Sequence, residues 1–129
     1  AMTGHLLLDK IDSRKPVTIS PDVIETVIRE YIGFQGLLIS DDISMAALTG
    51  DLSSITKNVF LAGCDVVLHC NGKLDEMKKI VDKNQGFGAV SQKRANKFLI
   101  KLTELKKQRK AIDYMTMLAS FNQSFGNSL

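Results

Sequence analysis

The stretch that decides the interpretation of this sequence is Gly36-Leu37-Leu38-Ile39-Ser40-Asp41-Asp42-Ile43-Ser44-Met45. A short apolar run, Leu37 to Ile39, follows a glycine and ends at a hydroxyl group and two carboxylates. Uninterrupted apolar runs of this length are typical of strands buried on both faces, as in parallel sheets. The pattern therefore predicts a strand over 36–40 with acidic side chains at its C-terminal end.

The two aspartates are expected to have different roles. Successive side chains of a strand point to opposite faces, so Asp41 and Asp42 cannot both face one substrate. One is expected to face a site, because barrel enzymes place their chemistry at the C-terminal ends of strands. The other is expected to cap a short helical segment over 43–48. Strand-end aspartates are also ordinary helix caps, so the residues alone leave the catalytic interpretation open.

Length and composition are those of an ordinary globular domain, with 129 residues, 44% hydrophobic and 24% charged. No apolar run approaches the roughly 20 residues of a membrane span, and no secretory signal is visible, so no membrane association is expected. Cys64 and Cys70 bracket a predicted strand over 65–69. At about 3.3 Å per residue they lie on the order of 20 Å apart, too far for a disulfide. Two unpaired thiols favour a cytoplasmic location.

The net charge of +3 is unevenly distributed. Residues 91–110 contain eight Lys or Arg and one acid, a net charge of +7 that leaves −4 for the rest of the chain. A basic helix raises the hypothesis of a nucleic-acid partner. A solvated face of an amphipathic helix explains the same charges, and the one aromatic residue, Phe98, lies on the apolar stripe. No nucleic-acid binding is therefore expected.

The rest of the sequence predicts strands alternating with helices, from hydrophobic spacing and breaker residues. The expected elements are a strand over 1–8, a helix from Ser20-Pro21-Asp22 to Gly33, a helix from Ser53 or Ser54 to Leu61, a strand over 65–69, helices over 73–83, 91–110 and 112–119, a loop over 84–88, and a frayed tail from Asn122. This alternation implies parallel βαβ units and an α/β fold. Three apolar strands expect neighbours on both sides, so the chain is expected to be a piece of a larger domain.

At this point the residues resemble glycoside hydrolase family 3. Val27-Ile28-Arg29 followed by Gly33-Phe34-Gln35 and the stretch 36–45 closely resembles the active-site signature of that family. Three further stretches agree in order and spacing: Met2-Thr3-Gly4-His5; Ile11-Asp12 with Pro16 and Ser20; and Ala62-Gly63-Cys64-Asp65-Val66-Val67-Leu68-His69-Cys70-Asn71. The similarity runs from residue 1 to about residue 110, and is strongest to bacterial β-N-acetylglucosaminidases of peptidoglycan recycling. Two departures are Tyr31, on a helix, and Gly4, which replaces an alanine.

The resemblance implies a fold and a domain division. The strands at about 1–8, 36–40 and 65–69 correspond to the last three of a TIM (β/α)₈ barrel, with their helices and a basic closing helix, over 1–110. Residues 111–129 are expected to form a C-terminal helical tail.

The resemblance also implies a retaining exo-β-N-acetylglucosaminidase in which Asp41 is the catalytic nucleophile. Met45 lies in the loop that helps to wall the sugar site. His5, near a strand end, is a candidate contact for the sugar, and a histidine satisfied by a backbone carbonyl is an equally good interpretation. His69 is a weaker candidate of the same kind, and Asp65, at the opposite end of its strand, is expected to be structural.

No cofactor is implied, because a carboxylate and an acid/base suffice for glycoside hydrolysis. No metal site is expected, because no ligands lie at metal-binding spacing. The family's acid/base dyad and sugar-binding motifs do not occur in this sequence, so the chain alone is expected to be inactive or nearly so. The alternative is a non-catalytic barrel segment that self-associates through unpaired strand edges.

Overall fold

The computed structural model describes residues 1–82, 88–108 and 114–125. The chain divides into two compact units, Ala1–Phe98 and Leu99–Leu129. The elements, in chain order, are η1 (Val17–Ile19), η2 (Val23–Tyr31), β1 (Ile39–Asp42), α1 (Leu52–Ala62), β2 (Val66–Leu68), α2 (Leu74–Asp82), α3 (Ala89–Gln108) and α4 (Tyr114–Phe125). The unit boundary falls within α3. The mixed α/β class that the sequence predicts is confirmed.

Two short strands form the sheet. β1 pairs with β2 in parallel, with Ile39 opposite Val66 and Asp42 opposite Leu68 and an irregularity between the two pairs. Met2 adds an isolated parallel bridge to Ile39, through hydrogen bonds of 2.9 Å from Thr3 N to Ile39 O and from Ile39 N to Ala1 O. Three segments therefore run side by side in one direction, with β1 in the middle.

The expected strand over 1–8 is wrong beyond this bridge. After Thr3 the backbone bonds to the following loop, because the Leu6 carbonyl accepts from Val17 N at 2.8 Å. The Leu8 carbonyl accepts from Ile11 N and Asp12 N, which closes a turn. These groups are consequently not part of a strand ladder.

The central strand is displaced along the chain, from the expected 36–40 to Ile39–Asp42. The Leu37 carbonyl accepts from the N-terminal amine at 2.9 Å, and Leu38 N donates to the Asp65 carboxylate at 2.9 Å. The apolar pattern predicted a strand that ends at Ser40, whereas β1 in the structure continues through Asp41 and Asp42. The other strand is shorter than expected, Val66–Leu68 in place of 65–69.

The predicted helix at 21–33 exists, but its main part, η2, is a π-helix. Ser20 caps it as expected, accepting from Val23 N at 3.3 Å through Oγ. At the far end Ile32 N donates to Val27 O at 2.8 Å, five residues back. The Arg29 guanidinium closes this end by donating to the carbonyls of Phe34 and Gly36, both at 2.9 Å.

The segment 43–48 forms turns and not the expected helix, with Met45 N bonded to Asp42 O and Leu48 N to Met45 O. The N-cap of α1 is Asp51, whose Oδ1 accepts from Ser54 N at 3.0 Å, so the expected serine cap is wrong. The predicted stop at Gly63 is confirmed, with φ of 107°.

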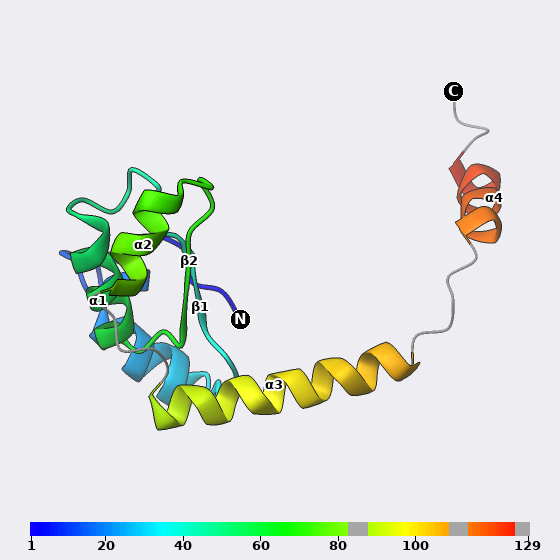
Figure 1. Cartoon of the computed structure of the whole chain (residues 1–129). Helices are drawn as coiled ribbons and strands as arrows, with labels where there is room; N and C mark the ends of the chain where they lie inside the picture. Colours follow the sequence, from blue (N-terminus) through cyan, green and yellow to red (C-terminus); the bar gives the residue numbers. More distant parts are fainter. Residues whose placement is uncertain (83–87, 109–113, 126–129) are drawn as a thin grey trace. The chain divides into compact units, whose positions relative to one another are not determined.

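α1 and α2 lie on the same side of the strand pair (Figure 1). The buried apolar cluster lies there and consists of Ile24, Leu38, Ile43, Leu48, Ile55, Val59, Ala62 and Cys64. It joins η2, the start of β1, the turns after it and α1. The C-terminal end of β1 is thus held on a packed layer.

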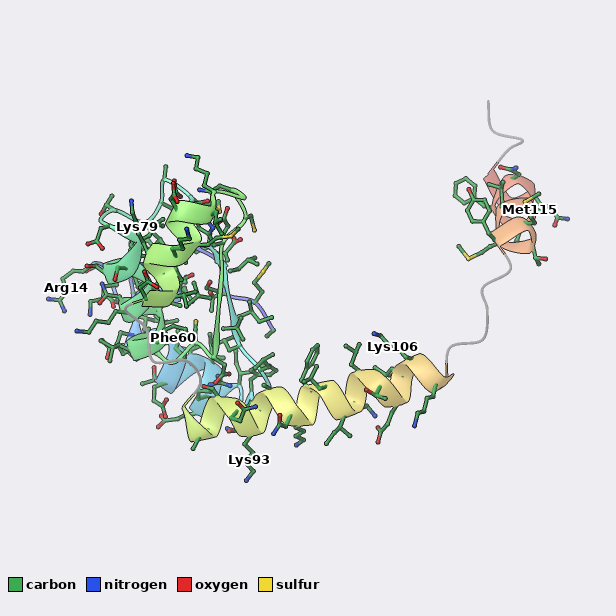
Figure 2. All side chains as sticks on the ribbon, in the orientation of Figure 1. Arg14, Phe60, Lys79, Lys93, Lys106 and Met115 are labelled. Atoms are coloured by element: carbon green, nitrogen blue, oxygen red, sulfur yellow. The ribbon has the colours of Figure 1, made fainter. Side chains whose placement is uncertain are left out.

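The predicted helices over 73–83 and 91–110 correspond to α2 and α3. The loop expected over 84–88 lies outside the described residues except for Gly88. α4 is longer than the expected 112–119 and includes Asn122, where fraying was predicted; 126–129 are not described. Lys93 and Lys106 of α3 are both exposed (Figure 2). Within the described ranges, no helix is both long and apolar enough to cross a bilayer.

Candidate active site

Asp41 lies in the C-terminal half of β1, between the N-terminal segment and β2. Its side chain is half-buried. Asp41 Oδ1 accepts a hydrogen bond of 2.8 Å from Asp42 N. Because the three segments are parallel, their C-terminal ends meet at one edge, and this carboxylate lies there.

The sequence predicts that one of the two aspartates caps a helix over 43–48; this segment forms turns, so that prediction is wrong, and Asp42 instead closes the first turn after β1. Its Oδ1 accepts from Ser44 N at 3.0 Å and from Cys70 N at 3.2 Å, and both of its oxygens accept from Ser44 Oγ at 2.8 Å. Burial opposes ionisation, but the hydrogen bonds from Ser44 and Cys70, with nearby His69, hold the pKa of Asp42 below its ordinary value. Asp42 is therefore an ionised group that ties the end of β1 to the end of β2.

His5 contacts the same aspartate from the other neighbouring segment. Its Nε2 lies 2.9 Å from Asp42 O, and its Nδ1 lies 2.9 Å from Thr18 Oγ1. A carbonyl oxygen only accepts, so Nε2 carries the proton in this bond. Thr18 is fully buried and fixes the ring from behind. Both ring nitrogens have protein partners here, and contact between His5 and a sugar stays a prediction.

Met45 lies in the turn after β1, where its side chain is exposed. Its backbone N donates to Asp42 O at 3.2 Å, so this carbonyl accepts from both Met45 and His5. The turn is thereby fixed at the same edge as Asp41. The role of the Met45 side chain in walling a sugar also stays a prediction.

A polar cluster behind the end of β2 is not evident from the sequence. Glu76 of α2 accepts from Asn71, lies 3.2 Å from His69 Nε2 and pairs with Lys73 at 3.2 Å. The hydrogen bond from Asn71, followed by those from Lys73 and His69, lowers the pKa of Glu76 below its ordinary value. The cluster fixes the 69–73 loop, and so the Cys70 N–H that reaches Asp42.

Asp65 lies at the other end of β2, as expected of a structural residue. Its Oδ2 accepts from Leu38 N at 2.9 Å and from Arg29 at 3.0 Å, and its Oδ1 accepts from Ser91 at 2.7 Å and from Arg94 at 3.0 Å. Burial opposes its ionisation, but the hydrogen bonds from Ser91, Leu38 N and Arg94 lower the pKa of Asp65. We call Asp65 and its four partners, Arg29, Leu38, Ser91 and Arg94, the hub; it joins η2, the residue before β1 and the start of α3.

A cavity of about 680 Å³ lies between the 43–55 stretch and α2. Its lining includes Ser44, Asn71, Glu76 and Lys79, but not Asp41, His5 or Met45. The predicted site residues thus lie outside this cavity; each of them hydrogen-bonds to Asp42, Asp41 through the Asp42 N–H, and His5 and Met45 through its carbonyl. In the described part of the chain, no three His, Cys, Asp or Glu residues are grouped to hold a metal ion.

Comparison with known proteins gives a family match over most of the chain. The family model described as the glycosyl hydrolase family 3 N terminal domain matches residues 1–105. The β-hexosaminidase of Psychromonas ingrahamii is 34% identical over 113 residues, which cover 80% of this chain and 33% of that protein. The β-hexosaminidase of Methylococcus capsulatus is 40% identical over 72 residues, covering 54% of this chain and 21% of that protein. The chain therefore spans at most about a third of the length of these relatives.

Solved structures give the same picture. The zinc-bound CbsA of Thermotoga neapolitana superposes with a TM-score of 0.62 and 25% identity, covering 78% of this chain and 25% of that one. The β-N-acetylglucosaminidase of Thermotoga maritima superposes with a TM-score of 0.52 and 33% identity, covering 65% of this chain and 21% of that one. The similarity again covers only a part of each known protein.

Proposed function

Because this chain belongs to glycosyl hydrolase family 3, we propose that it carries the nucleophile of a retaining exo-β-N-acetylglucosaminidase, and that Asp41 is that nucleophile. The single observation that supports this role best is the position of Asp41 at the C-terminal edge of three parallel segments. Asp42, the other acid at this edge, has its carboxylate engaged by Ser44 and Cys70. Asp41 is the aspartate left to act on a substrate.

The proposed reaction needs an ionised carboxylate. Asp41 attacks the anomeric carbon of a terminal β-linked N-acetylglucosamine, the bond to the leaving oxygen breaks, and a covalent glycosyl-aspartyl intermediate forms. Water then releases the sugar. A separate acid/base protonates the leaving oxygen and later activates the water. Neither His5 nor His69 is proposed for that role: both ring nitrogens of His5 have partners within the chain, and the His69 side chain is only 6% exposed and is bonded to Glu76.

We propose that the three parallel segments are the last three strands of a (β/α)₈ barrel. The order with β1 in the middle and the helices on one side supports this, since barrel strands are parallel and covered by helices outside. In such a barrel the catalytic edge is the C-terminal one, where Asp41 lies.

The proposed substrate class is muropeptide-type sugars, with a cytoplasmic role in peptidoglycan recycling. The relatives are a β-hexosaminidase and a β-N-acetylglucosaminidase, which supports a sugar of this kind. Two free cysteines, one of them exposed, suit a reducing compartment. The small-molecule carbohydrate is the expected partner, and no cofactor is required.

Trapping with a fluorinated donor tests the nucleophile. A slow 2-fluoro or 5-fluoro glycosyl donor is expected to label Asp41 in the complete protein, where the acid/base and the sugar-binding residues are supplied, and peptide mass spectrometry locates the label. Asp41→Asn is expected to remain unlabelled, whereas Asp9→Asn, at another exposed aspartate, is expected to label like the unaltered protein. A label on another residue refutes the assignment.

We also propose that this chain alone turns over ordinary substrates poorly or not at all. General acid catalysis contributes about 10²–10⁴-fold, and the sequence contains no motif for the family's acid/base. A chromogenic N-acetylglucosaminide separates the cases. Turnover that disappears in Asp41→Asn would overturn the expected inactivity.

Self-association is the second candidate function, because the first segment exposes apolar side chains. Met2 is 61% and Leu6 is 66% exposed, and Leu7 and Leu8 are exposed beside them. These leucines lie outside the strand ladder, so they offer apolar contact area and not a strand edge. Among the described residues the outer edge of β2 has no partner strand, and bare strand edges template pairing with another chain. Light scattering is expected to show oligomers that Leu6→Lys weakens. A monomer at all concentrations would exclude this candidate.

A further inference from the structure

We propose that His5 and Asp42 are positioning residues that hold the Asp41 carboxylate in one orientation. The proposal rests on the proposed function only in naming Asp41 as the nucleophile. The geometry belongs to the free chain and can be measured without a substrate.

The backbone of Asp42 is fixed from the N-terminal segment. His5 Nε2 lies 2.9 Å from Asp42 O, and the ring is oriented by Thr18 Oγ1, 2.9 Å from Nδ1. Thr18 is fully buried and also lies 2.9 Å from Thr3 Oγ1, a buried neighbour. The Thr18 hydroxyl, which also donates to Gly4 O at 3.2 Å, can serve Nδ1 as donor or acceptor, whereas the Asp42 carbonyl only accepts and so requires the proton on Nε2. The ring is therefore poised to donate to the carbonyl at the end of β1.

The side chain of Asp42 is fixed from the opposite direction. Its Oδ1 accepts from Cys70 N, just beyond β2, and from Ser44 N in the turn after β1. The next residue is tied to the same strand, because Ile43 N donates to Leu68 O at 3.0 Å. Asp42 is thus held between the first segment and β2, one on each side of β1.

The remaining polar group of Asp42 is the one that reaches the proposed nucleophile. Its N–H donates to Asp41 Oδ1 at 2.8 Å. An amide whose own residue is fixed at its carbonyl and its carboxylate has a fixed direction, so the oxygen that it bonds is fixed as well. The second oxygen of Asp41 is then presented in a constant direction, which is what a nucleophile in a near-attack arrangement requires.

The test uses isotope-labelled chain and two pairs of matched variants. His5→Gln keeps an N–H donor near the position of Nε2, whereas His5→Phe keeps a ring without a donor. Asp42→Asn keeps an oxygen acceptor, whereas Asp42→Ala removes it. Thr26→Ala is the control: it deletes an exposed hydroxyl on η2 that donates to the carbonyl of Asp22, the residue before η2.

Three NMR measurements report the arrangement. Long-range ¹H–¹⁵N correlation gives the His5 tautomer, three-bond couplings give the Asp41 χ1 rotamer, and hydrogen exchange gives the protection of the Asp42 amide. We expect the Nε2–H tautomer and one Asp41 rotamer. His5→Phe and Asp42→Ala are expected to raise the exchange rate of the Asp42 amide about tenfold or more and to average the couplings. His5→Gln, Asp42→Asn and the control should remain close to the unaltered chain.

Each result decides the proposal. An Nδ1–H tautomer or averaged Asp41 couplings in the unaltered chain would overturn it, even if the severe variants do not fold. Folded His5→Phe and Asp42→Ala variants with unchanged exchange and couplings would also overturn it. Fluoro-donor labelling remains independent: an ordered Asp41 that is never labelled contradicts the proposed function alone, and a labelled Asp41 that ignores His5 and Asp42 contradicts this inference alone.

Discussion

Replacing Arg29 with methionine is expected to destabilise the fold strongly, because Arg29 is the more buried of two cations on one buried carboxylate. The side chains of Arg29 and Asp65 are 5% and 1% exposed, and they pair at 3.0 Å. Methionine fills similar space without a charge. The substitution leaves Asp65 bonded to Leu38 N, Ser91 and Arg94, but with one cation where it had two.

The magnitude follows from burial. Removing one partner of a buried ion pair costs about 3–5 kcal/mol, since an uncompensated charge remains. Arg29 also donates to the carbonyls of Phe34, Gly36 and Gly63, which lose a partner. Arg94 still contacts Asp65, so the lower end of the range, about 3 kcal/mol, is expected. That is a large share of a typical total stability of about 5–15 kcal/mol.

Arg94→Met is the matched control. Arg94 contacts the same carboxylate at the same 3.0 Å, but its side chain is 19% exposed. Water can replace part of its interaction, so a loss of about 1 kcal/mol is expected. The two variants thus share the distance to Asp65 and differ in burial and in the three carbonyl bonds that Arg29 makes.

Urea unfolding followed by far-ultraviolet circular dichroism measures both, since the chain has no tryptophan. The double variant Arg29→Met with Asp65→Leu is expected to lose less than the sum of the single losses, with a coupling of about 1–3 kcal/mol. Equal losses for Arg29→Met and Arg94→Met, or losses that add within about 0.5 kcal/mol in the cycle, would refute the account of the hub.

Three further predictions concern acid, the thiols and a glycine. Burial raises the pKa of Asp65 in the folded chain, but the hydrogen bonds to it outweigh burial and lower that pKa below the unfolded value. The stabilisation from ionised Asp65 is therefore complete above about pH 4 and is lost as the pH falls through the folded pKa. Urea midpoints that do not fall in acid would contradict this. Burial raises the pKa of Cys64 to about 12, so iodoacetamide at pH 8 is expected to alkylate exposed Cys70 alone, and two adducts on folded chain by mass spectrometry would disagree. Gly63→Ala is expected to cost about 1–2 kcal/mol in urea unfolding, because φ is 107° and an added Cβ would lie 3.0 Å from Ile24 Cγ2; an unchanged midpoint would count against it.

Features set by one or two neighbouring residues could be predicted from the sequence. Ser20 caps the helix that follows it, and Gly63 ends α1, because a hydroxyl acceptor and a positive φ act within a turn. The start of α1 was wrong for a similar reason: Asp51 and Ser53 are both good caps, and their order in the chain does not show which side chain bonds.

Features that depend on distant partners could not be predicted. The displacement of β1 depends on Leu38 bonding to Asp65, 27 residues away. The expected strand over 1–8 fails because its carbonyls bond to the loop that follows, which periodicity does not reveal. The π-helical winding of η2 ends at a buried arginine that donates to Phe34 and Gly36, and helical spacing alone does not distinguish this from an α-helix.

The site shows the same division between local and distant information. Strand alternation predicts that Asp41 and Asp42 differ in role, and the Asp42 carboxylate closes a turn, although the helix that it was expected to cap does not form. Two of the groups that hydrogen-bond to Asp42 lie far from it in the chain: His5 is 37 residues before it, and Cys70 is 28 residues after it. Neither partner can be identified from the sequence near Asp42, because both are distant along the chain and one of them is a backbone amide, which almost any residue supplies. A sequence can therefore name the acid at a strand end, but the direction in which that acid points depends on the two segments that pack beside it.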